Sequence, residues 1–449
     1  MAKRVHEIRD PIHVFVRLDS QERDALDCWP LQRLRHVHQL GLTYLIYPGA
    51  THRRFEHSLG VMELASRVFD VVTRSDALQD SVRDQLPELA NREDDVHRYW
   101  RRVLRMAALC HDIGHLPFSH AAEEELLPRG WDHERITADL IRSNEMVSIW
   151  RNMRPGLEAD DIVKLALGPG RAMGTDGSPM DFTCAEEILA EIIVGHAFGV
   201  DRMDYLLRDS HHAGVAYGKF DHFRLIDTLR ILPAPLSGGD DESGEPMLGV
   251  EEGGLLSAEA LLLARYMMYS QVYFHPVRRI YDIHLRDFLG EWLEGGVFST
   301  MAQDQLAMTD NEVLSAIRVA AGEPSTPGHD PARRICAHDH YRRVYSRRPS
   351  DLAKNPDAGS AVAHAVEHQF GADAVRYDTY RQKQGLEDFP VLRDDGVASS
   401  ASMSDVLQSI PVVATDYVFV VPEQCEAAKR WLRSNVDDVI EPREETGDG

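Results

Sequence analysis

Residues 111–120 have the sequence His-Asp-Ile-Gly-His-Leu-Pro-Phe-Ser-His, which places three histidines and an aspartate within ten positions. The nearly uncharged run 103–109 precedes them and predicts a buried helix that delivers its last residues into a cavity. We expect Gly114 and Pro117 to end that helix. Imidazole and carboxylate groups both bind divalent ions, and an ion offsets the cost of burying Asp112. The run therefore predicts a metal site for phosphate-ester chemistry; without an ion, Asp112 would need another partner.

The composition is that of a soluble globular protein. The chain has 449 residues, 43% of them hydrophobic and 27% charged, so the length favours roughly two to three domains or one large helical body. No run approaches the roughly 20 apolar residues of a membrane span, and the N-terminus lacks an apolar signal core. We expect a cytoplasmic protein without membrane contacts. The five scattered cysteines predict reduced, mostly buried thiols.

The charge distribution bears on the ligands. A formal net charge of −24 disfavours indiscriminate nucleic-acid binding, although short single strands stay possible. A polyanionic ligand then requires local positive charge, for which arginine clusters are geometrically suited. Two clusters exist, and a solvated helix face is the alternative for each: Arg33, Arg35, His36, His38, Arg53 and Arg54, and later Arg333, Arg334, Arg342, Arg343, Arg347 and Arg348.

Three regions are expected along the chain. Residues 1–230 carry nearly all the His and Asp clusters and form the candidate catalytic domain, with helical patterns at 55–72 and 188–209. Residues 231–290 form a helical extension that completes the pocket. This region contains an exposed loop at 233–244, followed by a strong helical pattern at 255–289. Residues 291–449 form a helical and α+β region, with a strand at 417–421, an amphipathic helix at 423–433 and a disordered tail.

A histidine upstream adds to the predicted metal site. His57 shares one face of its expected helix with the apolar residues at 61, 64 and 68, so it points inward. A single histidine on an apolar face is more often a hydrogen-bonded core residue than a ligand. When His57 is considered together with His111 and Asp112, its interpretation as a metal ligand is favoured.

A second acidic helix face lies further along the chain. Asp201, Tyr205 and Asp209 recur every four residues and therefore share one face. Asp204 and Arg208 resemble an ordinary ion pair between residues four apart. Asp201 is either a metal ligand or the N-terminal cap of its helix.

The ordered set His57, His111, Asp112 and Asp201 resembles the metal ligands of the HD-domain phosphohydrolase superfamily. The stretches 31–41, 47–60, 111–120 and 201–209 are more specific and look like the deoxynucleoside triphosphate triphosphohydrolase branch, over about residues 6–290. The absence of Gly-Tyr-Pro disfavours the cyclic-dinucleotide phosphodiesterase branch. We therefore expect a mostly α-helical HD-domain fold with a small C-terminal α+β appendage.

The resemblance implies a substrate pocket for a dNTP. The residues that would line it are Gln39, Leu40, Arg54, Tyr205, Asp209 and Tyr273. Gln39 and Leu40 would contact the deoxyribose, discriminating at the 3′-hydroxyl and excluding a 2′-hydroxyl, and Arg54 would grip phosphate.

The resemblance also implies catalytic histidines around the triphosphate, His115, His120 and His133. Imidazoles suit this role because one can protonate the leaving oxygen while another orients water. Glu123 stands where the related enzymes have a shorter aspartate. The products would be a deoxynucleoside and inorganic triphosphate. The ligand set accommodates Fe, Mn, Zn, Co or Ni, and Mg²⁺ would accompany the triphosphate.

An activating nucleotide site is a further implication of the resemblance. Asp27, Gln32 and Arg35 match a guanine-nucleotide site, with Arg224 as a neighbour, so GTP or a dNTP would be the activator. His6 replaces a lysine of that site. Such sites lie between subunits, which implies a homodimer or homotetramer.

Two alternatives to a dNTP triphosphohydrolase stay open. One is an HD-type phosphohydrolase or nuclease that acts on another nucleotide or on single-stranded DNA. The other is a regulatory module that senses nucleotides through a degenerate pocket, which the presence of all four ligand types disfavours.

Overall fold

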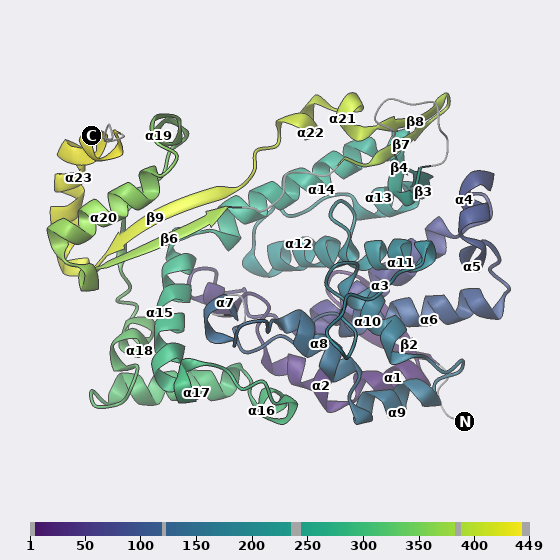
Figure 1. The fold of residues 1–449 in the computed structure, drawn as a ribbon, viewed down its shortest axis with the longest axis horizontal. Helices are drawn as coiled ribbons and strands as arrows, with labels where there is room; N and C mark the ends of the chain where they lie inside the picture. The colour runs from purple at the N-terminus through teal and green to yellow at the C-terminus, as the bar shows by residue number, and fades with distance from the viewer. Residues whose placement is uncertain (1–4, 119–122, 235–243, 382–387, 442–449) are drawn as a thin grey trace, which may run out of the picture. The chain divides into compact units, whose positions relative to one another are not determined.

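The computed structural model describes residues 5–118, 123–234, 244–381 and 388–441. The chain divides into two compact units. The first contains Met1–Met268, Val297–Val313 and Leu386–Ile410, and the second contains Tyr269–Gly296, Leu314–Gly385 and Pro411–Gly449 (Figure 1). The protein is mostly α-helical, as expected, with small sheets. The tail at 442–449 and most of the loop at 233–244 lie outside the described residues. The division into the regions 1–230, 231–290 and 291–449 stays a prediction.

The first unit is built around helix α3 (Arg54–Val72), which packs against α6 (Asp95–Cys110), α11 (Cys184–Val194), α12 (Val200–Ala213) and α13 (His222–Thr228) (Figure 1). Its other helices are α1 (Ser20–Leu26), α2 (Trp29–Arg33), α4 (Asp80–Gln85), α5 (Pro87–Ala90), α7 (Glu123–Leu126), α8 (His133–Ile141), α9 (Asn144–Asn152), α10 (Ala159–Leu167), α14 (Leu255–Met268), α16 (Ala302–Ala307), α21 (Ser400–Met403) and α22 (Asp405–Ser409). Helix α17 (Asp310–Gly322) begins in this unit.

Helix α6 carries the predicted apolar run. The Asp94 carboxylate caps it by accepting a hydrogen bond from the Val96 N–H, and residues 103–110 are all buried. The expected helix is confirmed, but it ends at Cys110, before the predicted breakers Gly114 and Pro117. His111 follows as the C-terminal cap, so the helix end itself brings His111 to the site.

Two small sheets belong to the first unit. Strands β1 (Val5–Asp10) and β2 (Val14–Asp19) form an antiparallel hairpin. Strands β3 (Leu229–Pro233), β4 (Pro246–Glu251), β7 (Pro390–Arg393) and β8 (Gly396–Ser399) form a mixed sheet in that order, in which β4 pairs with β7 in parallel. Strands β7 and β8, from late in the sequence, therefore complete a sheet of the first unit.

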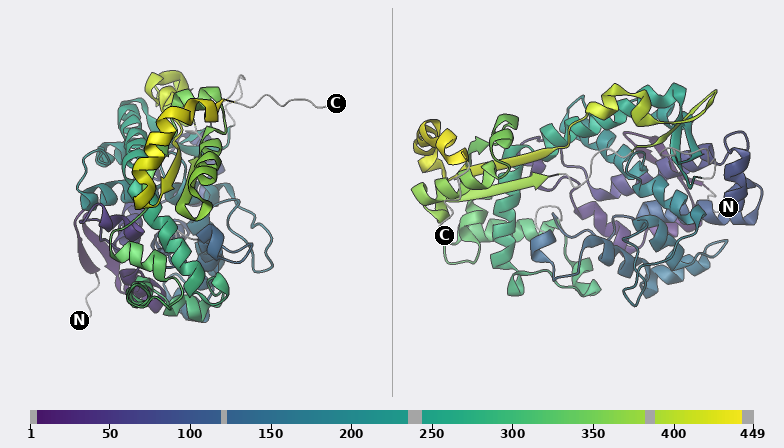
Figure 2. Two further views of the ribbon diagram at one scale, coloured as in Figure 1. Left: turned by 90° about the vertical axis from the view of Figure 1, so that its left-hand side faces the viewer. Right: turned by 45° about the horizontal axis from the view of Figure 1, so that its top comes forward.

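The second unit contains the C-terminal α+β part. Strands β5 (Arg342–Ser346), β9 (Ala414–Val420) and β6 (Val375–Arg381) form an antiparallel sheet (Figure 2). Helices α15 (Pro276–Trp292), α20 (Ala358–Phe370) and α23 (Cys425–Ile440) pack on this sheet. Helix α18 (His329–Cys336) packs against α15, and α19 (Pro349–Lys354) packs against α20. Val418 and Val420 pack with α20 and α23, whereas Tyr417 and Phe419 pack with α15. The predicted strand and final helix are both confirmed.

Two helices expected to be continuous are interrupted, so those predictions were wrong. The pattern at 188–209 belongs to α11 and α12, which are separated at Gly195 and Gly199; the Gly199 N–H donates to the Gly195 carbonyl at 3.0 Å. The pattern at 255–289 passes through a π-helix, Tyr269–Tyr273. Pro276 then starts α15, because proline has no N–H to continue the preceding helix.

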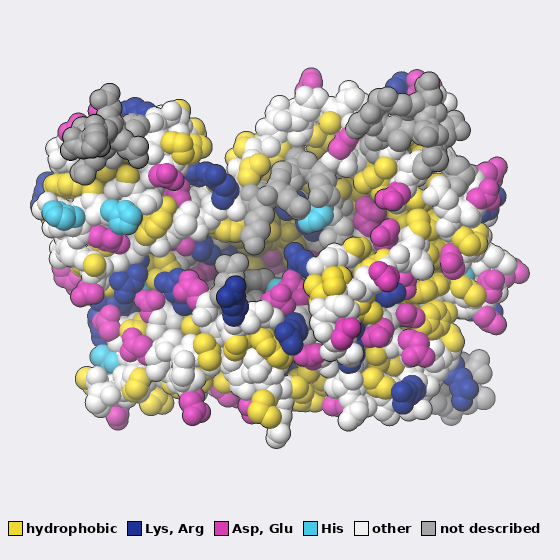
Figure 3. Space-filling model, viewed as in Figure 1, with side chains coloured by type: hydrophobic (Ala, Val, Ile, Leu, Met, Phe, Trp, Pro, Cys, Tyr) yellow, Lys and Arg dark blue, Asp and Glu magenta, His cyan; other side chains and the backbone are white. Residues whose placement is uncertain are grey.

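Within the described residues, no helix has both the length and the apolar character needed to span a bilayer. All five cysteines are free, and three of them are buried. Acidic and basic side chains are mixed over the face drawn in Figure 3.

Candidate metal centre

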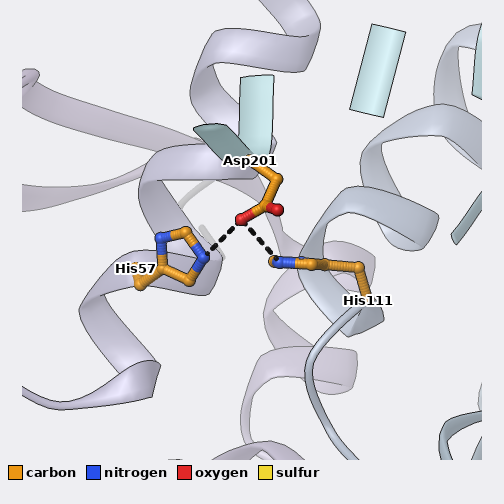
Figure 4. Close-up of side chains that lie close together, drawn as sticks. All are labelled: His57, His111 and Asp201. Atoms are coloured by element: carbon orange, nitrogen blue, oxygen red, sulfur yellow. Dashed lines mark hydrogen bonds and ion pairs between the residues drawn. The ribbon is translucent and has the colours of Figure 1, made fainter. Parts of the chain in front are cut away.

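Three segments of the first unit bring together three of the predicted ligands. His57 lies on α3, His111 follows α6, and Asp201 lies in the first turn of α12 (Figure 4). Their ligand atoms all lie within 4.8 Å of one another. Asp201 Oδ1 is 3.0 Å from His57 Nε2 and 3.5 Å from His111 Nε2. The alternative role of Asp201 as a helix cap is wrong, because Gly199 occupies that position.

The outer nitrogens of both histidines have partners that only accept hydrogen bonds. His57 Nδ1 is 2.8 Å from a carboxylate oxygen of Asp204, and His111 Nδ1 is 2.8 Å from the Ala108 carbonyl. Each Nδ1 therefore carries a proton, which leaves Nε2 as the nitrogen available to coordinate an ion. His111 Nε2 is buried and has no hydrogen-bond partner among the residues described. Both nitrogens are thus presented as a metal site requires.

The electrostatics of the cluster also call for a cation. Burial opposes protonation of His57, but hydrogen bonds with Asp201 and Asp204 outweigh it and raise the pKa of His57 to about 10. Burial likewise opposes ionisation of Asp201, yet its histidine partners hold the pKa of this carboxyl below its usual range. Without an ion, the proton on His57 supplies the positive charge beside the ionised Asp201. A divalent ion can take the place of that proton, so these residues fit a divalent ion.

Asp112, the predicted fourth ligand, borders the cluster. Its Oδ2 is 2.5 Å from Arg54 Nη1, while its Oδ1 is 3.2 Å from His115 Nε2 and 3.4 Å from His111 Nε2. Burial opposes ionisation, but the charges of His111 and Arg54 and a hydrogen bond with His115 lower the pKa of Asp112 well below its usual range. Arg54 is thus the partner that the buried carboxylate needed, and coordination by Asp112 stays a prediction.

Two predicted catalytic histidines lie together beside Asp112. The rings of His115 and His133 stack at 4.1 Å, with an angle of 12° between their planes. Burial, followed by the charges of Arg54 and His133, lowers the pKa of His115 well below its usual range, so this ring is neutral. His120 lies outside the described residues, and Glu123 is the first residue of α7.

Gly114 permits this stacking. An added Cβ at position 114 would lie 2.3 Å from the His133 carbonyl oxygen and 2.4 Å from the Thr137 backbone nitrogen. The loop after α6 therefore approaches α8 backbone to backbone, which only glycine allows here.

His52, which was not predicted from the sequence, contacts two of the predicted pocket residues, Gln39 and Asp209. The His52 carbonyl accepts a hydrogen bond from the Gln39 N–H at 3.1 Å, and its Nε2 is 2.7 Å from Asp209 Oδ1. The side-chain oxygen of Gln39 is buried, with no hydrogen-bond partner in the described part of the chain. No local pattern around His52 distinguishes it from a core histidine.

The remaining predicted pocket residues are distributed over both units. Leu40 is buried beside Gln39, and Tyr205 is half-buried on α12. Tyr273 ends the π-helix of the second unit, where its ring packs edge-on against Tyr269.

A carboxylate from late in the chain supports the site and was also missed. Asp310 is fully buried and accepts hydrogen bonds from the His38 N–H at 2.7 Å and the Phe118 N–H at 3.2 Å. It therefore holds the segment of Gln39 against the loop of His115. The pairing spans 272 residues from His38, so no sequence spacing signals it.

Two of the predicted activator residues contact each other, and the other two contact residues outside this set. Arg35 Nε donates to Gln32 Oε1 at 2.8 Å, and its guanidinium lies 3.5 Å from the centre of the Phe55 ring. Asp27 pairs with Arg23. Arg224 donates to the Gly253 carbonyl.

Four arginines of the later cluster are paired with carboxylates, which leaves less positive charge for a polyanionic ligand. Arg333 and Arg334 pair with Asp330. Arg347 pairs with Asp416 at 2.6 Å, and Arg348 pairs with Asp351 at 3.1 Å.

Comparisons with known proteins agree with this geometry. The HD domain family model matches residues 54–209, and the model of an HD associated region matches residues 220–374. The human deoxynucleoside triphosphate triphosphohydrolase SAMHD1 is 30% identical over 368 residues, which cover 75% of this chain and 54% of the relative. An uncharacterized protein of Methanocaldococcus jannaschii is 33% identical over 279 residues, covering 62% of this chain and 48% of the relative.

The chain spans about half the length of these curated relatives. A crystal structure of a hypothetical protein from Aquifex aeolicus matches with a TM-score of 0.74 and 31% identity, covering 95% of this chain and 100% of that one. The chain belongs to the HD-domain phosphohydrolase superfamily and is similar to its deoxynucleoside triphosphate triphosphohydrolases.

Proposed function

We propose that the protein is a metal-dependent dNTP triphosphohydrolase that releases a deoxynucleoside and inorganic triphosphate. The observation that carries this proposal is the convergence of His57, His111 and Asp201, with both imidazole Nε2 atoms directed at one carboxylate. The relatives that are about 30% identical and named deoxynucleoside triphosphate triphosphohydrolases support the substrate class.

The residues around the centre fit phosphate-ester hydrolysis. His57, His111 and Asp201, with Asp112, would hold a divalent ion, whose chemistry is to polarise a phosphoryl oxygen and lower the pKa of a bound water. The neutral His115, stacked on His133, would exchange a proton with the leaving oxygen. Arg54 offers a guanidinium for the phosphates beside Asp112.

Product analysis tests the reaction. The purified protein is incubated with Mn²⁺ or Mg²⁺ and each dNTP, alone and with GTP or a second dNTP added. Release of a deoxynucleoside with intact triphosphate supports the proposal. Monophosphate and pyrophosphate as products would contradict it, and no turnover in any mixture would favour a sensing role.

Sugar selection is proposed to depend on Gln39. We expect Gln39→Ala to reduce the preference for dATP over ATP by roughly ten- to a hundredfold, because the buried amide would no longer discriminate at the sugar hydroxyls. The measurement is the ratio of kcat/KM for the two nucleotides. Gln303→Ala, at an exposed position of α16, is the matched control. Unchanged discrimination in the Gln39 variant would remove this residue from the sugar site.

The activator site also remains part of the proposal. Asp27, Gln32, Arg35 and Arg224 would bind GTP or a dNTP in a homodimer or homotetramer, for which the contact between Gln32 and Arg35 is the local support. We expect turnover in the product analysis to require GTP. We expect Arg35→Ala to abolish this activation by GTP.

A further inference from the structure

Asp204 forms the most heavily hydrogen-bonded buried carboxylate near the metal centre. Its side chain is fully buried, and its Oδ2 lies 2.8 Å from His57 Nδ1. Its Oδ1 lies 2.6 Å from His13 Nε2. Arg208 contacts both oxygens, at 2.8 and 2.9 Å. The expected ion pair with Arg208 is therefore present, but it is one part of a larger network.

This network fixes the orientation of His57. Asp204 follows Asp201 by three residues on α12, so one helix supplies both the carboxylate that faces His57 Nε2 and the carboxylate that holds His57 Nδ1. Because both ring nitrogens are engaged from the same helix, neither the tautomer nor the plane of the ring is free to change.

The turn of the N-terminal hairpin completes the network. Asp10 Oδ1 accepts hydrogen bonds from the Ile12 and His13 N–H groups, both at 2.8 Å, and Asp10 Oδ2 accepts from Arg208 at 2.9 Å. His13 is thus held in place by the same carboxylate that binds the arginine.

Close packing of α3 on α12 is part of the same arrangement. A Cβ added at Gly60 would lie 1.9 Å from Asp204 Oδ1 and 2.5 Å from Arg208 Nη2. Buried ion pairs add little net stability compared with apolar packing of similar volume. A contribution to core stability alone therefore does not account for so many charges at this position.

We propose that Asp204 is a positioning residue for His57, and that His13 and Asp10 make the N-terminal hairpin turn a part of the metal site. The inference rests on the metal centre of the proposed function. It assigns a role to residues 10–13, which lie outside the matched HD domain of residues 54–209.

Cobalt binding without nucleotide tests this role. We expect His13→Leu to weaken Co²⁺ binding by about 10- to 100-fold, the usual cost of removing a group that orients a ligand. His13→Gln, whose side-chain amide can still donate to Asp204 Oδ1, should restore most of the affinity. Calorimetric titration of metal-free protein gives the affinity, and the visible absorption of bound Co²⁺ reports the ligand geometry.

A matched control separates positioning from general stability. His97→Leu removes another buried histidine, which contacts Thr73, the C-terminal cap of α3 at the end away from His57, and should leave Co²⁺ affinity and absorption unchanged. Asp204→Asn should weaken binding at least as much as His13→Leu. Wild-type Co²⁺ affinity and absorption in folded His13→Leu protein would overturn the proposal.

The outcome is distinguishable from failure of the proposed function. If Co²⁺ binds in a way that depends on Asp201 and His13 but no dNTP is hydrolysed, the positioning role stands and the dNTP triphosphohydrolase proposal fails. If no Co²⁺ binding depends on Asp201, the positioning role fails as well.

Discussion

Replacing Asp201 by Asn removes the bound metal and lowers hydrolysis by more than about a hundredfold. Loss of a group that only orients a ligand costs about 10- to 100-fold, so loss of the ligand itself costs more. The amide is nearly the same size but lacks the charge that would balance an ion held with the two imidazoles, 3.0 and 3.5 Å away. Metal content per protein and initial rates of triphosphate release are the two measurements.

The fold should survive this change. The Asp201 side chain is 34% exposed and forms no helix cap, so an amide at this position leaves no buried polar group without water. Asp84→Asn, at an exposed position of α4, should change neither metal content nor rate. An Asp201→Asn protein with full metal content and normal turnover would remove Asp201 from the ligand set.

Gly114→Ala should disable the enzyme through geometry instead of charge. The new methyl group would lie 2.3 Å from a carbonyl oxygen of His133 and 2.4 Å from the Thr137 backbone nitrogen, and backbone atoms cannot rotate away. The N-terminus of α8 must then move, which separates His133 from His115 and strains the hydrogen bond from Gly114 N–H to Thr137 Oγ1. We expect a loss of about 1–3 kcal/mol in the free energy of unfolding, as for other overpacked cores.

Urea unfolding and kcat measure the two effects of Gly114→Ala. Gly322→Ala is the matched control, because its Cβ would meet no atom within 4 Å, and alanine favours a helix over glycine by up to about 1 kcal/mol. The same substitution should thus have opposite signs at the two positions. Normal stability and kcat in Gly114→Ala would show that α8 tolerates the displacement.

Local patterns were sufficient to predict the helices at His57 and His111, whereas α12, which carries Asp201, was expected to be continuous with α11. The apolar run before His111 and the spacing around His57 depend on contacts within one or two helical turns, and α6 and α3 form as expected. The structure brings His57, His111 and Asp201 together as the ordered motif implied.

Contacts between distant segments could not be predicted in this way. Asp204 was recognised only as the partner of Arg208, because spacing along a helix says nothing about the histidines of other elements. Strands β3 and β4 were missed because their sheet is completed by β7, about 140 residues further along, and short strands depend on such neighbours. The contacts of Asp310 with His38 and Phe118 could not be predicted for the same reason.

The position of Asp310 has a consequence for biosynthesis. All the proposed metal ligands have left the ribosome soon after residue 201, but the carboxylate that joins the backbones of His38 and Phe118 is made about a hundred residues later. Strand β7, which pairs with β4, is synthesised later still. During this interval the nascent chain carries a complete ligand set in an unfinished domain with an unpaired strand edge, the kind of surface that chaperones cover. Translation that stops early would therefore release chains that contain every ligand yet cannot finish the site.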